Sequence, residues 1–250
     1  MQTTAETPVT PSAPRHVQVL IFDDVEVLDF AGPFEVFGVT GLRTGPAPFR
    51  VETVGLSKAP IRARNGLEVR PSASIDEATR CDVLVLPGGF GTRREMHNAT
   101  LLHWIRRQAR AAEAVLSVCT GALLLARAGL LDGLDATTHH VAFDELAQAS
   151  PSTNILRGAR YVDNGHIVTS AGISAGIDAS LHVVAKLLGH AVAVETAQYM
   201  EYDWNSQHNE WKQTPLDTSP VISTPKVAAG ESIRASETST PYGPASLEPE

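Results

Sequence analysis

The sequence has few cysteines, no long apolar run and no excess of positive charge. Only Cys81 and Cys119 occur among 250 residues, and neither belongs to a CxxC pair or a Cys/His cluster. A disulfide framework or a structural metal is therefore not expected. No run reaches the roughly 18 apolar residues of a membrane span. The formal net charge of −8 argues against nucleic acid and anionic membranes as partners.

The two ends of the chain differ in composition from its middle. The first residues are polar and rich in Pro and Thr, without the basic start and apolar stretch of a signal peptide. Together with the low cysteine content, this predicts a cytoplasmic location. We expect a disordered leader over residues 1–15, one α/β domain over 16–204, and a partly disordered extension rich in Pro, Ser and Thr over 205–250.

Short apolar runs rich in Val, Ile and Leu alternate with segments of helical period. Strands are predicted at residues 17–22, 49–56, 81–89, 114–118 and 166–172. Helices are predicted at 28–38, with Pro33 near the start, and at 97–112, 120–128, 139–149 and 174–188. Residues 195–202 are expected to close the core. This alternation is typical of βαβ units and predicts a mostly parallel sheet with helices on both faces.

The stretch "VLSVCTGALLLARAGLLDG" (115–133) places Cys119 where a strand turns into a helix. Ligand sites of parallel sheets lie beyond the carboxyl ends of the strands, and a strand-to-helix elbow exposes a nucleophile there. The helix N-terminus, with the amides of Thr120 and Gly121, is expected to lower the pKa of the thiol. The alternative is a buried, inert cysteine.

The segment "LPGG" follows the strand that begins at Cys81. Gly88 and Gly89 are candidates for presenting backbone amides to a developing negative charge, as an oxyanion hole does. An ordinary turn between a strand and a helix is the alternative.

Three further polar residues are candidates for the same sheet edge. Asp29, flanked by Leu28 and Phe30, is either a desolvated acid with a raised pKa or a helix N-cap. His139 and His140 in "ATTHH" form either a base or polar wall near the thiol, or a surface or capping pair. The glycine-rich stretch 170–178 lacks the lysine of a phosphate-binding loop, so nucleotide binding is not expected.

Taken together, "LDFAGPFEVF", "LVLPGG", "VCTGALLLARAGLLDGLDATTHH" and "VTSAGISAGID" resemble the ThiJ/PfpI superfamily, relatives of class I glutamine-amidotransferase domains. The resemblance covers about residues 17–204. It implies a flavodoxin-like three-layer sandwich, a homodimer, and a reactive cysteine on the nucleophile elbow. Within the superfamily the chain is most similar to isonitrile (cyclohexyl-isocyanide) hydratases, whose Asp and Cys-Thr pattern matches Asp29, Cys119 and Thr120.

The resemblance implies hydration of an isonitrile to an N-substituted formamide by a cysteine-dependent hydro-lyase that needs no cofactor or metal. Cys119 would form a covalent thioimidate and Asp29 would act as acid and base. Thr120 would position the water or the intermediate, and the amides of Gly88 and Gly89 would polarise the intermediate. The expected pocket residues are His139, His140 and Ile173.

The chain also departs from patterns within the superfamily. Thr120 stands where peptidase-like members have a histidine, and Asp29 stands where chaperone- and glyoxalase-like members have a glutamate. His140 replaces an aromatic residue of the hydratases, which predicts a different pocket. Alternatives are a glyoxalase or deglycase acting on small carbonyls, and a ligand- or redox-sensing domain related to AraC-type regulators. Such regulators continue into two helix-turn-helix units. The Pro/Ser-rich extension and negative charge here predict no DNA binding.

Overall fold

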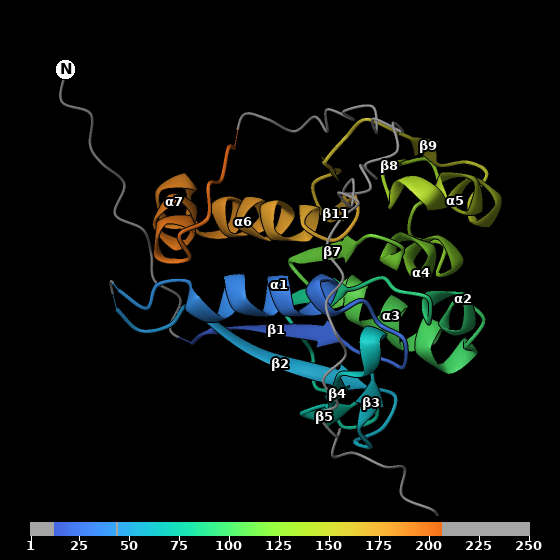
Figure 1. Ribbon diagram of the computed structural model, residues 1–250, viewed down its shortest axis with the longest axis horizontal. Coiled ribbons are helices and arrows are strands. Elements are labelled where there is room, and N and C mark those ends of the chain that lie inside the picture. Colours follow the sequence, from blue (N-terminus) through green and yellow to red (C-terminus); the bar gives the residue numbers. More distant parts are fainter. Residues whose placement is uncertain (1–12, 44, 207–250) are drawn as a thin grey trace, which may run out of the picture. The chain divides into compact units, whose positions relative to one another are not determined.

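Seven strands form one sheet in the computed structural model, which describes residues 13–43 and 45–206 (Figure 1). Their order is β10-β11-β7-β6-β1-β2-β5. Strand β10 is antiparallel to β11, and all other neighbours pair parallel. The sheet strands are β1 (Arg15–Leu20), β2 (Phe49–Gly55), β5 (Ala73–Ser74), β6 (Val83–Leu86), β7 (Ala114–Val118), β10 (Tyr161–Asp163) and β11 (Ile167–Ser170).

Two smaller pairs of strands stand apart from this sheet. An antiparallel hairpin joins β3 (Ile61–Arg62) to β4 (Glu68–Val69) through the 3₁₀ turn η1 (Arg64–Gly66). Strands β8 (Asp135–Ala136) and β9 (Asn154–Ile155) pair parallel. A second 3₁₀ turn, η2 (His140–Ala142), lies between β8 and β9 in the chain.

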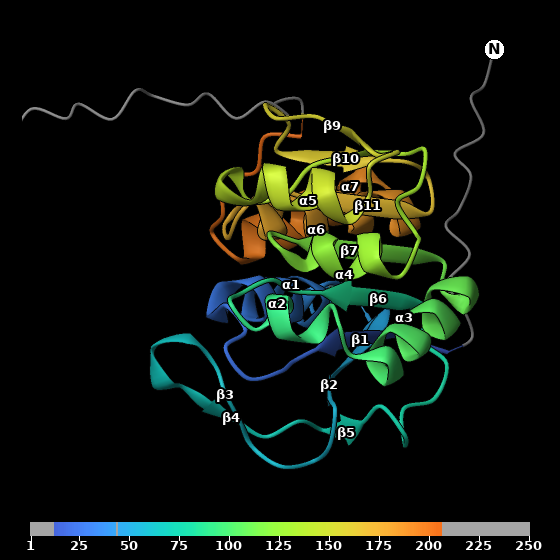
Figure 2. The same ribbon diagram turned by 90° about the vertical axis from the view of Figure 1, so that its right-hand side faces the viewer.

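Helices cover both faces of the main sheet. They are α1 (Val27–Val39), α2 (Thr92–Glu95), α3 (Ala99–Ala111), α4 (Gly121–Arg127), α5 (Phe143–Ala149), α6 (Ala175–Leu188) and α7 (His190–Tyr199). Helix α6 contacts α1 and α7, whereas α4 contacts α2, α3 and α5. Figure 2 shows α4 and α5 on the near side and α6 and α7 on the far side. The expected three-layer, flavodoxin-like sandwich is confirmed.

The central strands are buried along their whole length. Every residue of β6 ("VLVL") and of β7 ("AVLSV") is buried. A strand covered by helices on both faces gains from apolar side chains on each, so the pattern is a continuous run rather than an alternation. This is why the sequence predicts the central strands well.

Element boundaries differ from the expectations at several places. Strand β1 begins at Arg15, the last residue of the expected leader, because the Arg15 amide donates to the Pro48 carbonyl at 2.8 Å. Pro33 lies well inside α1, which begins at Val27. Helix α7 begins at His190 rather than at residue 195, directly after Gly189 (φ 96°) ends α6. The leader up to residue 12 and the extension from residue 207 lie outside the described residues.

Two predicted helices also begin later than expected. Helix α3 begins at Ala99 because the side chain of Asn98 caps it, accepting from the Leu101 amide at 3.2 Å. The segment expected to be helical from residue 139 forms turn η2 first, and α5 follows from Phe143.

The strand order changes direction between β1 and β6. After β1 the chain turns to β2 on one side, and β6, β7 and β11 follow on the other. Ligands of open α/β sheets bind beyond the carboxyl ends of the strands at such a switch point. The segments that follow β1, β6, β7 and β11 carry Asp29, Gly88, Cys119 and Ile173, respectively.

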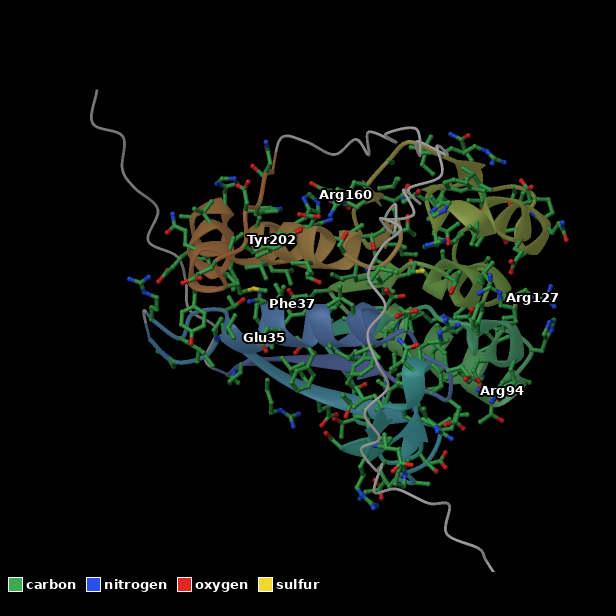
Figure 3. The ribbon with its side chains drawn as sticks, in the orientation of Figure 1. Glu35, Phe37, Arg94, Arg127, Arg160 and Tyr202 are labelled. Carbon is green, nitrogen blue, oxygen red and sulfur yellow. The ribbon has the colours of Figure 1, made fainter. Side chains whose placement is uncertain are left out.

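We predict that Phe37→Ala lowers the free energy of unfolding by about 3–5 kcal/mol. Phe37 is fully buried and its ring meets Phe49 edge to face, with 5.1 Å between centroids (Figure 3). Urea unfolding followed by circular dichroism measures the loss. Phe34→Ala on the same helix is the matched control, because that ring is 38% exposed, and it should cost less than half as much. Equal losses for both variants would contradict the packing described here.

Candidate active site

Cys119 occupies a strained elbow between β7 and α4. Its φ of 57° lies in the left-handed region, which costs a non-glycine residue about 1–3 kcal/mol. The Cys119 amide donates to the carbonyls of Ser170 and Ala171 at 3.2 and 3.1 Å. The hydroxyl of Thr138 donates to the Cys119 carbonyl at 2.8 Å. The amide and the carbonyl of Cys119 are thus both held by neighbouring segments, and the predicted strand-to-helix elbow is confirmed in geometry.

Gly121 allows α4 to begin directly against the end of β6. A Cβ at this position would lie 1.9 Å from the Leu86 carbonyl oxygen, a distance that no side chain tolerates. The missing side chain thus permits a close approach of the two backbone segments. The role of Gly121 is to set the position of Cys119 relative to the loop after β6.

Asp29 lies in the first turn of α1 with no solvent exposure. Its Oδ2 accepts a hydrogen bond from the Gly88 amide at 3.0 Å. Its Oδ1 is buried, and no nitrogen or oxygen of the described residues bonds to it. The N-cap position belongs to Glu26, so the capping interpretation of Asp29 is wrong. The carboxyl instead faces the elbow, where it is close enough to the Cys119 thiol for each group to shift the pKa of the other.

Burial raises the pKa of Asp29 to about 7, against the opposing effect of the Gly88 amide. The charge of Glu26 adds to the rise, while the hydrogen bond from the thiol lowers the pKa. Asp29 therefore exchanges a proton near neutral pH, as expected from its apolar sequence neighbours. Because thiol and carboxyl are in contact, the two groups titrate as a pair.

The expected fall in the pKa of Cys119 is wrong for this site. Burial raises the pKa of the thiol, and the negative charge of Asp29 raises it further. A helix terminus contributes about 0.3–2 kcal/mol, whereas burying an unpaired ion costs several kcal/mol. Burial prevails, and Cys119 rests as a thiol, which would have to lose its proton to act as a nucleophile.

The amides of Gly88 and Gly89 do not form the expected oxyanion hole. Gly88 donates to Asp29, and Gly89 donates to the hydroxyl of Thr120 at 3.0 Å. The Thr120 hydroxyl also accepts from the hydroxyl of Thr92 at 3.1 Å, so it is not directed to a water or an intermediate. These groups hold the loop after β6 against the elbow, and this is the physical reason that they are unavailable to a ligand.

Two other backbone amides approach the thiol. The N–H groups of Thr120 and Ile173 both favour the Cys119 thiolate, and Ile173 also favours the Asp29 carboxylate. Ile173 has a φ of 55°, a second strained position beside the first. It was expected only as a pocket side chain. These two amides form the candidate oxyanion hole. The sequence indicated the Thr120 amide but not that of Ile173, because a backbone orientation leaves no motif.

A pocket with a volume of about 170 Å³ opens onto the thiol. It is lined by Glu26, Arg64, Gly89, Phe90, Arg93, Cys119, Thr120, His139, Val141 and Ile173. Of the three expected pocket residues, His139 and Ile173 line this cavity. Burial lowers the pKa of His139. Its Nδ1 accepts from the Val141 amide at 3.4 Å, which places the proton of the neutral ring on Nε2.

His140 does not line this pocket, contrary to expectation. The His139 ring occupies the space above Gly172, where a Cβ would lie 2.1 Å from it, and so takes the position near the thiol. His140 lines a neighbouring hollow of about 230 Å³, together with Arg160. Arg160 pairs with Asp178, whose other oxygen accepts from the Tyr202 hydroxyl at 3.1 Å. Figure 3 labels Arg160 and Tyr202, both beside α6.

Sequence reasoning missed five residues of the pocket: Glu26, Arg64, Phe90, Arg93 and Val141. Four of them lie within four positions of a recognised motif, so closeness in sequence to a motif offered a weak signal. Arg64 offered none, because it reaches the pocket on the β3–β4 hairpin, far in the sequence from every motif.

The chain matches the model of the DJ-1/PfpI family over residues 15–186. It belongs to the DJ-1/PfpI family. It is 36% identical over 184 residues to the isonitrile hydratase of Pseudomonas putida, a match that covers 73% of this chain and 74% of the hydratase. The recognition made from the sequence motifs is thereby confirmed at the level of the family.

Regulators are among the relatives of this DJ-1/PfpI protein. The chain is 26% identical to the HTH-type transcriptional regulator GbdR of Pseudomonas aeruginosa, with 81% of the chain and 55% of the regulator covered. It thus spans about half the length of that relative. Among solved structures, a ThiJ/PfpI family protein from Pseudomonas syringae has a TM-score of 0.69 at 28% identity, covering 83% of this chain and 85% of that one.

Other expectations stay predictions. No helix in the described part of the chain is long and apolar enough to cross a membrane. Within residues 13–43 and 45–206, no three His, Cys, Asp or Glu side chains cluster as metal ligands would. The homodimer, the cytoplasmic location, the domain limits and the independence from cofactors are not tested by these observations.

We predict that Asp29→Asn accelerates alkylation of Cys119 by iodoacetamide at pH 8 about tenfold, the effect of one pKa unit on the thiolate fraction. The substitution removes the negative charge that raises the pKa of the thiol. Peptide mass spectrometry measures the rate. The control is Glu35→Gln, an exposed acid on the same helix, which should leave the rate unchanged. A slower reaction in Asp29→Asn would contradict the assigned electrostatics.

Proposed function

We propose that this DJ-1/PfpI protein is a cysteine-dependent hydro-lyase that hydrates an isonitrile to an N-substituted formamide. The observation that carries the proposal is that the Cys119 thiol and the Asp29 carboxyl are both buried and each shifts the pKa of the other. The terminal carbon of an isonitrile must gain both a nucleophile and a proton, and such a pair supplies both. The 36% identical hydratase of Pseudomonas putida supports the same reaction class.

In the first step the Cys119 sulfur bonds to the terminal carbon of R–NC. Asp29, as carboxylate, takes the thiol proton and delivers it to the same carbon. The product is the thioimidate R–N=CH–S–Cys119, and Asp29 returns to its ionised form. A pKa of about 7 suits this role, since the carboxyl must both accept and release a proton at neutral pH.

In the second step a water molecule in the pocket adds to the thioimidate carbon. Asp29 takes a proton from this water and delivers it to the imine nitrogen, which gives the intermediate R–NH–CH(OH)–S–Cys119. The Thr120 and Ile173 amides are placed to stabilise negative charge on the new oxygen. Asp29 then moves the proton of the new hydroxyl to the sulfur as the C–S bond breaks, and R–NH–CHO leaves. The balance is one isonitrile and one water consumed for each formamide released.

A second candidate function is ligand sensing without turnover. The regulators GbdR and CdhR of Pseudomonas aeruginosa, at 26% and 31% identity, favour it. The chain covers only 55% and 44% of those proteins. An enzyme converts many equivalents of an isonitrile when wild-type protein is present in substoichiometric amount, whereas a sensor does not.

We predict that purified protein converts an aryl isonitrile to the aryl formamide, followed by ultraviolet absorbance, and that Cys119→Ala abolishes turnover. kcat/KM should fall as pH drops below about 7, because protonated Asp29 no longer accepts the thiol proton. In Asp29→Asn the rate should fall by about 10²-fold or more, and the acidic limb should disappear.

The control is Cys81→Ala, which should retain activity because burial raises the pKa of the Cys81 thiol to about 12 and keeps it unreactive. Activity retained in Cys119→Ala would refute the covalent scheme. An unchanged acidic limb in Asp29→Asn would remove Asp29 from the proton transfer. Absence of turnover, with Cys119 still reactive toward iodoacetamide, would favour sensing or a carbonyl substrate.

A further inference from the structure

Two arginines line the catalytic pocket, and their surroundings differ. Arg93 donates from Nε and Nη2 to the two carboxylate oxygens of Glu145, both at 2.8 Å. Its Nη1 donates to the Gly89 carbonyl at 3.3 Å. All three nitrogens of this guanidinium are engaged, so Arg93 is a structural link between α2 and α5.

The guanidinium of Arg64 is not engaged in this way. Its nearest carboxylate is that of Glu26, with 4.0 Å between Nε and Oε2, at the limit for an ion pair. Its plane lies over the Phe90 ring, 3.9 Å from the centroid. No hydrogen bond from this guanidinium to another part of residues 13–43 or 45–206 is formed. An arginine has five N–H donors, and those of Arg64 stay available to a ligand in the pocket.

The backbone holds Arg64 in place at the pocket wall. Its amide donates to the Val25 carbonyl at 2.9 Å, and the Ala63 amide donates to the Leu67 carbonyl at 2.8 Å. The hairpin is thus tied to the segment before α1, and the side chain is only 31% exposed. A cation fixed in position with unused donors is suited to ligand binding, because little order is lost when the ligand binds.

Three partly or well exposed apolar side chains also line the pocket, beside the polar Glu26, Arg93 and His139. Phe90 and Val141 are 66% and 67% exposed, and Ile173 is 38% exposed. These side chains come from three different loops and line the same pocket as Arg64. A ligand that reaches from Cys119 to Arg64 therefore passes apolar walls before it meets the guanidinium.

We propose that Arg64 binds a carboxylate on the substrate, so that the substrate class is an isonitrile with a compact apolar or aromatic body ending in a carboxylate. This inference rests on the proposed hydratase function. The planar guanidinium offers paired N–H groups that match the two oxygens of a carboxylate. The substrate carboxylate replaces the weak contact with Glu26, and the ring of Phe90 packs beside the substrate body.

The test compares 4-isocyanobenzoate with its uncharged methyl ester as substrates. Wild-type protein is expected to show the higher kcat/KM for the carboxylate. Arg64→Gln should reduce the carboxylate-to-ester ratio about tenfold or more, the effect of losing a charge-assisted hydrogen bond. The matched control is Arg62→Gln, an exposed arginine on the same hairpin that does not line the pocket, and its ratio should equal that of wild type.

Equal ratios in wild type, Arg64→Gln and Arg62→Gln would overturn the role of Arg64 while leaving the hydratase function intact. Arg64→Lys is a second variant, which keeps the test decisive if Arg64→Gln does not fold. It keeps the charge but loses the planar fork, and its ratio should lie between those of wild type and Arg64→Gln. A ratio for Arg64→Lys below that of Arg64→Gln would contradict charge recognition.

A binding measurement separates the two proposals. Calorimetry on Cys119→Ser should show 4-formamidobenzoate binding more tightly than 4-formamidobenzamide, and the added substitution Arg64→Gln should abolish the difference. If no isonitrile is hydrated but this difference is seen, the hydratase proposal fails and Arg64 stands as an anion-binding residue. If isonitriles are hydrated and the two formamides bind equally, only the proposal on Arg64 fails.

Discussion

The carboxyl of Asp29, buried between the Gly88 amide and the Cys119 thiol, is the contact on which the rest of the site depends. Full ionisation of such a group without a cation would cost several kcal/mol, so it keeps a proton within reach at neutral pH. The same contact joins α1, the loop after β6 and the elbow after β7. Three segments that are distant in sequence thereby hold one exchangeable proton.

Backbone amides at this site divide into two sets with different tasks. Those of Gly88 and Gly89 bind Asp29 and Thr120 and hold the loop after β6 in place. The amides of Thr120 and Ile173 approach the sulfur. Their direction depends on the strained backbone at Cys119 and Ile173. Strain of about 1–3 kcal/mol at each position persists only because the sheet and the packing of Gly121 enforce it.

The inner and outer parts of the pocket have different structural origins. Asp29 and Cys119 follow strands of the parallel sheet, so any chain with this sheet and these residues brings them together. Arg64 comes from a hairpin and Val141 from a 3₁₀ turn, both outside that sheet. The sheet therefore fixes the inner site, whereas residues of the outer wall can vary without displacing it.

The sequence by itself determined the layered fold, the elbow at Cys119 and the acid at Asp29, because buried parallel strands and their connections leave strong local patterns. Only the tertiary structure decided the protonation of the thiol, the partners of the Gly88 and Gly89 amides, and the exclusion of His140. Each of these depends on desolvation or on contacts between segments that are far apart in the chain. Helix signals predict a low pKa at Cys119, and burial beside Asp29 reverses that prediction.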